Sequence, residues 1–210
     1  MKKTIKKGVK KILLIIIVLL ILLVISLIIY KLLNNNSDKE DIKVVDSIEN
    51  YGYNLDDRDS ALMKSKYEEL KKVLNSDEIN YEEYAKILSE LFVIDLFTMN
   101  NKINKYDVGS VEYVYTDSVD NFKLNVEDTI YKHMENNSDG KRKQELPEVK
   151  SIEVVSINSD EFEIDEESYE SFVVDLDWNY VKDLSYDNTA TITLINLDNK
   201  LYVVEYLVGE

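Results

Sequence analysis

Residues 172–180 read FVVDLDWNY, and apolar and polar side chains alternate along most of this stretch. In an extended chain one side would carry the large apolar side chains, which are Phe172, Val174, Leu176, Trp178 and Tyr180. Mostly polar partners would face the other way, which is typical of a strand that covers a hydrophobic core. The stretch therefore predicts a β-strand, with Trp178 buried against a helix at 81–99.

Segments on both sides of this stretch also favour strands. Residues 189–197 are rich in β-branched side chains, and Asp198-Asn199 predicts a tight turn before a return strand at 201–208. Residues 149–157 add a strand before it. We therefore predict an antiparallel meander of three or four strands. Two shorter apolar runs, at 42–48 and 111–115, are also assigned as strands.

Three segments that lie between the first short run and the meander show the apolar spacing of helices. The first begins after a cap at Asp59 or Ser60. The second, 81–99, is apolar on nearly every side, which predicts a buried central helix. The third, 119–136, repeats apolar residues at four-residue steps and predicts an amphipathic helix on the surface. The fold class predicted for this part is α+β.

The N-terminal part of the chain has the composition of a membrane anchor. Residues 12–30 read ILLIIIVLLILLVISLIIY, which as a helix would match the hydrocarbon core of a bilayer in length. We predict a transmembrane helix over 12–33. Six lysines precede it and few follow, so the positive-inside rule places the basic tail, 1–11, in the cytosol. The chain is then a single-pass cell-membrane protein with a polar tether at 34–41 and an extracellular domain at 42–210.

A cleaved signal peptide is the alternative for this segment. Secretory apolar regions are about 7–15 residues long and end at a pair of small residues. The apolar run here is longer and leaves through Tyr30, Lys31 and Leu32, which offer no such pair. We therefore favour a retained anchor.

Charge and composition exclude several functions. The chain has 25 basic and 41 acidic residues, and seven of the lysines lie within residues 1–33, where there is no acid. The rest of the chain is therefore strongly acidic and would repel a nucleic acid. There is no cysteine, one histidine and five glycines, which leaves no material for a thiolate or multi-histidine metal centre or a phosphate-binding loop. We predict no cofactor and no metal.

The order of elements resembles a known architecture. The helices at 81–99 and 119–136 and the strands between 151 and 208 are similar to those of the cystatin-like, nuclear-transport-factor-like cone fold. In that fold a curved antiparallel sheet wraps a helix. The Asn-, Lys- and Ile-rich sequence is similar to small envelope proteins of low-GC Gram-positive bacteria that carry such a domain on a single membrane span. A plain two-layer α+β sandwich fits the same pattern.

We therefore expect a membrane-anchored, non-enzymatic extracytoplasmic domain that binds another envelope protein or a wall component. Two alternatives stay open. One is a pocket enzyme or small-ligand binder of the cone fold. The other is a bridging subunit of a conjugation or type IV secretion apparatus.

Asp95 and Trp178 are the candidates for a ligand pocket. Asp95 lies within LFVIDLF, and a carboxylate among apolar neighbours can be tuned as a general base. Enzymes with the cone fold place acids in the pocket of the cone, which sharpens this hypothesis. No second catalytic group can be paired with it, so we predict no catalytic residue and a structural role for Asp95.

Other polar groups have plainer interpretations. His133 lies at the edge of an amphipathic helix and has no evident partner for proton transfer. Acidic clusters at 56–59, 160–161 and 165–167 lack the glycine turn of a calcium loop and are interpreted as solvated surface charge. Tyrosines on the strands (Tyr180, Tyr202 and Tyr206) either line an interaction surface or cover a half-exposed sheet face.

Overall fold

The computed structural model describes residues 16, 18–26 and 43–209. It divides into two units, residues 1–41 and 42–210. In the first unit, residues 18–26 are helical; the tail at 1–11, the tether at 34–41 and the rest of the predicted span at 12–33 lie outside the described residues. No helix within the described residues is both long and apolar enough to cross a bilayer.

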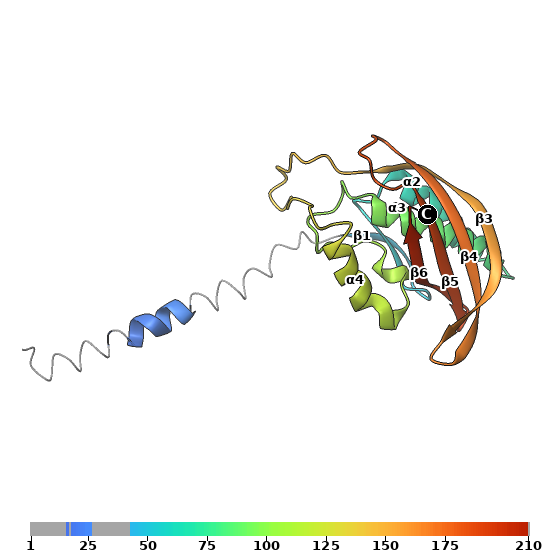
Figure 1. Cartoon of the computed structure of the whole chain (residues 1–210), viewed down its shortest axis with the longest axis horizontal. Helices are drawn as coiled ribbons and strands as arrows, with labels where there is room; N and C mark the ends of the chain where they lie inside the picture. The colour runs from blue at the N-terminus through green and yellow to red at the C-terminus, as the bar shows by residue number, and fades with distance from the viewer. Residues whose placement is uncertain (1–15, 17, 27–42, 210) are drawn as a thin grey trace, which may run out of the picture. The chain divides into compact units, whose positions relative to one another are not determined.

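The second unit is an α+β domain built on a four-stranded antiparallel sheet (Figure 1). Its strands follow one another in the order β3 (Val149–Ile164), β4 (Glu167–Tyr180), β5 (Thr189–Leu197) and β6 (Lys200–Val208). The predicted meander is confirmed. The long strands β3 and β4 bend along their length, so the sheet is visibly curved.

Two hairpin turns set the register of this sheet. Asp198 and Asn199 both have positive φ, 51° and 65°, as the predicted two-residue turn requires. Asp165 and Glu166 form a second turn of the same kind, with φ of 51° and 69°. This turn was not predicted: the sequence assigns a strand only to residues 149–157 and interprets the acidic residues that follow as solvated surface charge. The strands in fact continue to it, with Phe162 opposite Tyr169.

Two helices pack on the four-stranded sheet. The first, α2 (Ala61–Leu74), is capped by Ser60, whose hydroxyl accepts a hydrogen bond from the Met63 amide. The second, α3 (Tyr81–Phe97), is capped by Asn80 and is buried on nearly every side, which confirms the central helix. It lies against β3, β4, β6 and α2.

The predicted helix at 119–136 is correct only in its first half. The observed helix, α4 (Val119–Asp128), ends at Thr129, whose hydroxyl donates to the Asn125 carbonyl at 2.6 Å. The chain then turns inward, because Tyr131 is fully buried and its hydroxyl donates to the Leu96 carbonyl at 2.7 Å. A buried tertiary contact therefore overrides the continuing helical pattern.

The two short strands have different outcomes. β1 (Val44–Ile48) is present and pairs with β2 (Tyr53–Asp56) in a separate two-stranded sheet. The strand predicted at 111–115 is wrong: η1 (Val111–Tyr113) is a 3-10 turn, followed by a second, η2 (Thr116–Ser118). Only Val114 bridges to Val203, and the Tyr115 amide donates to the carbonyl of Val203 at 2.9 Å.

The core lies between α3 and the sheet. Trp178 is 1% exposed, and its ring centroid lies 5.0 Å from that of Phe97 at the end of α3. Phe172 and Leu176, on the same strand face, are also buried. The predicted burial of Trp178 against this helix is confirmed.

Candidate functional site

A charged hollow of about 390 Å³ lies beside the C-terminal turn of α3. Its lining comes from β1 and β2, from α2 and the turn before it, from α3, and from η1 and the loop that joins α3 to it. The charged residues in the lining are Asp56, Arg58, Asp59, Asp95, Lys102, Asp107 and Glu112. The hollow therefore gathers polar groups that are far apart in the sequence.

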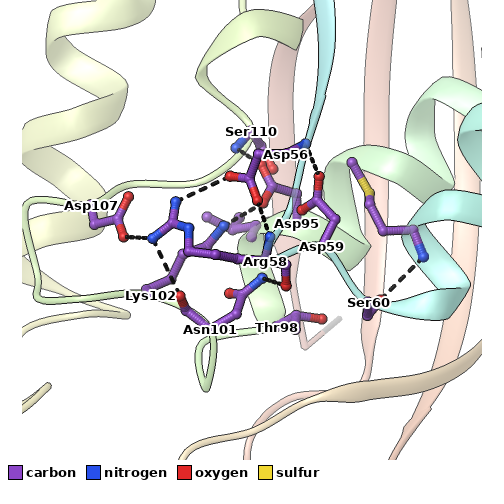
Figure 2. Close-up of polar contacts among 12 residues, drawn as sticks. Asp56, Arg58, Asp59, Ser60, Asp95, Thr98, Asn101, Lys102, Asp107 and Ser110 are labelled. Atoms are coloured by element: carbon purple, nitrogen blue, oxygen red, sulfur yellow. Dashed lines mark hydrogen bonds and ion pairs between the residues drawn. The ribbon is translucent and has the colours of Figure 1, made fainter. Parts of the chain in front are cut away.

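Asp95 is held at both carboxylate oxygens. Lys102 donates to one oxygen and the backbone N–H of Ser110 donates to the other (Figure 2). A carboxylate in the last turn of a helix is opposed by the helix dipole, and these two donors compensate for it. Because both oxygens have partners, Asp95 fixes the loop 98–110 against α3.

The partner of Asp95 is a buried lysine. The side chain of Lys102 is 6% exposed. Burial alone would lower the pKa of Lys102, but the charge of Asp95 raises it above the usual value. The pair is therefore ionic, and each charge depends on the other inside the domain.

A close backbone approach completes this contact. A Cβ added to Gly109 would lie 2.5 Å from the carbonyl oxygen of Asp95, which is closer than packed atoms come. The next residue, Ser110, has φ of 64° and donates its hydroxyl to the Phe92 carbonyl at 2.6 Å. Glycine at 109 is thus what allows the loop to lie on the helix end.

Arg58 forms the second fixed part of the hollow. Its guanidinium donates to Asp107 at 2.6 Å and to Asp56 at 3.1 Å, as Figure 2 shows. Burial would lower the pKa of Arg58, but the two carboxylates raise it above the usual value. Burial likewise acts to raise the pKa of Asp107, but Arg58 and the amide of Ile103 lower it overall.

Two carboxylates in the hollow have no cation of their own. Asp59 accepts a hydrogen bond from the Asp56 amide at 2.7 Å, and burial and the charges of Asp56 and Asp95 raise its pKa to about 6. Glu112 accepts from the Asn54 backbone N–H at 3.0 Å and from the Asn54 side-chain amide at 3.3 Å, and burial and the charge of Asp95 raise its pKa to about 7. Neither forms an ion pair within residues 43–209.

Tyr113 adds an unused hydroxyl. Its side chain is fully buried and lines the hollow. The hydroxyl lies close to Glu112 but has no hydrogen-bond partner of acceptable geometry among the described residues. Burial and the charges of Glu112, Asp95 and Asp59 raise the pKa of Tyr113 well above its usual value.

The two predicted pocket residues are not brought together. Asp95 lines the hollow, whereas Trp178 lies in the core beside Phe97 and is absent from the lining. Asp95 is also not the most buried acid of α3. Glu90 is 5% exposed and pairs with Lys66 of α2 at 2.7 Å.

The acidic clusters differ in placement. In the cluster at 56–59, only Asp57 is exposed, so its interpretation as solvated charge is wrong for Asp56, Arg58 and Asp59. The second cluster lies on the exposed hairpin of β3 and β4. Across the described residues, no three or more acidic or histidine side chains are placed to hold a metal ion.

The other polar candidates lie outside the hollow. His133 is exposed, and its carbonyl accepts a hydrogen bond from Gln144 at 2.9 Å. The three strand tyrosines are half-buried, and Tyr206 borders an apolar groove of about 210 Å³ between α4 and β6. The described lining of that groove holds no carboxylate, lysine or arginine, so the charged chemistry belongs to the first hollow.

Comparison with protein-family models, curated proteins and solved structures finds no match to this chain. Sequence reasoning missed Glu112, Lys102, Asp107 and Tyr113, which lie in irregular segments without a periodic pattern. The one available signal was Gly109-Ser110 beside charged residues, which marks a loop that packs closely.

Proposed function

We propose that the protein is a single-span membrane protein whose domain at 42–210 lies outside the cytoplasm and binds another envelope protein or a wall component. The lysine asymmetry around 12–33 supports this orientation. The curved sheet around a central helix is compatible with the cone fold that we propose for the domain.

The observation that supports binding is that some polar groups of the hollow have partners within the domain and others can still accept or donate further hydrogen bonds. Asp95, Arg58 and Lys102 are fixed by partners within the domain. Glu112 and the Tyr113 hydroxyl are positioned in the same hollow but have capacity for further contacts. A rigid concave frame with a few unused polar groups is typical of a binding site.

An acid–base enzyme is the second candidate, and one observation favours it. A carboxyl with a pKa of about 7, as for Glu112, is suited to proton transfer at neutral pH. The two candidates differ in what Glu112→Gln should do. In a binding domain the substitution weakens binding, whereas in an enzyme it abolishes turnover of a ligand that still binds.

Protease added to intact cells tests the proposed orientation. It should remove residues 34–210 and spare a tag on the N-terminus. Protection of the domain in intact cells, or release of a mature form that begins after Tyr30, would overturn the anchored arrangement.

Site-specific photo-crosslinking in cells tests binding at the hollow. A crosslinker at Asp57, which is exposed beside the hollow, should join the protein to one discrete envelope component. A crosslinker at exposed Glu153 on β3 is the control and should not give that product. Equal products from both positions would contradict binding at the hollow.

A further inference from the structure

The hollow has more carboxylates than cations to neutralise them. Its two cations, Arg58 and Lys102, are already engaged in three ion pairs. Glu112 and Asp59 line the same hollow without an ion pair in the described part of the chain. Half-buried carboxylates without a counter-ion are costly, and a bound cation would remove that cost.

Tyr113 gives a second and independent indication of a ligand. Its side chain is 0% exposed, and its hydroxyl has no hydrogen-bond partner among the described residues. Tyr113 lines the hollow next to Glu112 in the chain, and the charges of Glu112, Asp95 and Asp59 all act on its hydroxyl. Buried hydroxyls normally have a partner, so one is expected to arrive with a bound molecule.

The apolar side chains of the lining indicate that the ligand also has an apolar part. Aliphatic side chains complete the wall of the hollow, and these are Val44, Met63, Val108 and Val111. The volume of about 390 Å³ is within the range of small-molecule sites. An apolar stem would pack against these side chains while a charged head reached the carboxylates.

We propose that the hollow binds a small organic cation, an amine or guanidinium head on a short aliphatic stem, with Glu112 and Asp59 as its counter-ions. This inference rests on the proposed function of the hollow as a binding site. The head would donate one N–H to the Tyr113 oxygen, and the tyrosine hydroxyl would donate to Glu112. Glu112 would then gain a counter-ion, and the Tyr113 hydroxyl would gain a hydrogen-bond partner.

The same features argue against other ligands. The excess of carboxylates would repel an anion. No attraction would then offset the free energy that is needed to remove the anion from water. A divalent metal ion needs a compact group of oxygen ligands, and none is placed for one within the described residues.

Binding should depend on pH through groups from several elements. The charged or titratable groups that act on Glu112 are Asp95, Tyr67, Tyr113 and Lys200. Those that act on Asp59 include Asp56, Asp95 and Lys102. Lys200 lies over the rings of Tyr53 and Tyr202 at 4.8 and 4.6 Å and acts on Glu112 through its charge, but it forms no ion pair with Glu112 in the described part of the chain. Protonation of Glu112 and Asp59 removes the counter-charge and should release the ligand.

Calorimetric titration of the full chain in detergent tests the proposal, with agmatine and cadaverine as probes. Both should bind saturably at about pH 8, where both carboxyls are ionised, and at least about tenfold more weakly at about pH 5. The diol with the chain length of cadaverine should not bind. Equal binding of the diol and the diamine would overturn the proposal, and so would the absence of amine binding.

Three variants locate the effect. Glu112→Gln keeps an oxygen that can accept from the Asn54 backbone N–H, loses the oxygen that accepts from the Asn54 side chain, and removes the charge, so amine affinity should fall about tenfold or more. Glu153→Gln changes the net charge equally at an exposed site on β3 and should leave affinity unchanged. Tyr113→Phe removes only the hydroxyl and should weaken binding without loss of the fold. Wild-type affinity in both hollow variants would contradict the assignment.

The outcomes separate this inference from the proposed function. If no amine binds but crosslinking from residue 57 still captures an envelope component, the ligand class is wrong and the binding role stands. If amines bind but no crosslink forms, the hollow is a small-cation site and the envelope role fails.

Discussion

Lys102 donates to the Oδ1 atom of Asp95, seven residues earlier in the chain, and both side chains are largely buried, at 6% and 16% exposed. The pair joins the end of the central helix to the loop that carries Ser110. Its burial makes it costly to break from either side, because the remaining charge would lose its partner.

The first prediction concerns this pair. Asp95→Asn leaves Lys102 buried without a counter-ion and should lower the free energy of unfolding by about 3 kcal/mol. Lys102→Met should cost a similar amount, because Asp95 is then left with the Ser110 amide alone. The double variant should cost less than the sum of the two, which denaturant unfolding can measure. Additive costs would show that the two charges do not interact.

Gly109 gives a prediction about backbone packing. Its missing Cβ would meet the Asp95 carbonyl oxygen at 2.5 Å, so Gly109→Ala should destabilise the domain by about 2 kcal/mol or more. Gly140→Ala is a matched control: a Cβ there has no neighbour within 4 Å, and only its φ of 67° opposes alanine. That control should cost about 1 kcal/mol. Equal costs would mean that the loop does not lie on α3 as described.

Trp178 tests the core. Replacement by alanine should cost about 3–5 kcal/mol, because a fully buried ring beside Phe97 would leave a cavity. Val155→Ala, at a side chain that is 59% exposed, should change stability by less than about 0.5 kcal/mol. Trp178 is the sole tryptophan, so its emission reports this site alone. Red-shifted emission from the folded protein would contradict the burial.

The stability of the empty protein should also depend on pH. The pKa values of Glu112 and Asp59 are raised in the folded state to about 7 and about 6, so the folded chain holds these protons more tightly than the unfolded chain. Their contribution is therefore complete below the unfolded values near pH 4 and is lost as pH rises through about 6 to 7.

Thermal unfolding can measure this effect. Acidification from about pH 8 to about pH 5 should stabilise the protein by about 1–3 kcal/mol through these two groups. Glu112→Gln should remove most of that gain, whereas Glu153→Gln should keep it. A wild-type protein that loses stability steadily over this range would refute the shifted values.

The sheet could be predicted because the alternation of apolar and polar residues and the turn residues are local features of the sequence. Strand β4 alternates through Trp178, and Asp198-Asn199 suits a two-residue turn. The same pattern did not predict the turn at Asp165-Glu166, because two acidic residues are not a typical sequence for a two-residue turn. The apolar spacing extended α4 too far, because the inward pull of Tyr131 comes from a tertiary contact with Leu96.

The site was much less predictable. Asp95 was identified as the acid in an apolar segment, but its partners lie seven and fifteen residues away in a loop without periodicity. Glu112 belongs to a segment that the sequence assigns to a strand and that forms a 3-10 turn. Trp178 was correctly expected in the core and was therefore not available to a pocket. Charge compensation between loops depends on the folded chain and has no sequence signature.

Carbon-13 NMR can measure the pKa of the Glu112 carboxyl with and without a saturating amine, and so tests whether the hollow binds a cation. Glu112→Gln identifies the signal. Without a ligand the pKa should lie near 7, as burial and Asp95 dictate. A bound cation favours the ionised carboxylate, so cadaverine should lower the pKa toward the ordinary value of about 4.3. A pKa that stays the same with cadaverine present, or that is already ordinary without it, would contradict a cation-binding hollow.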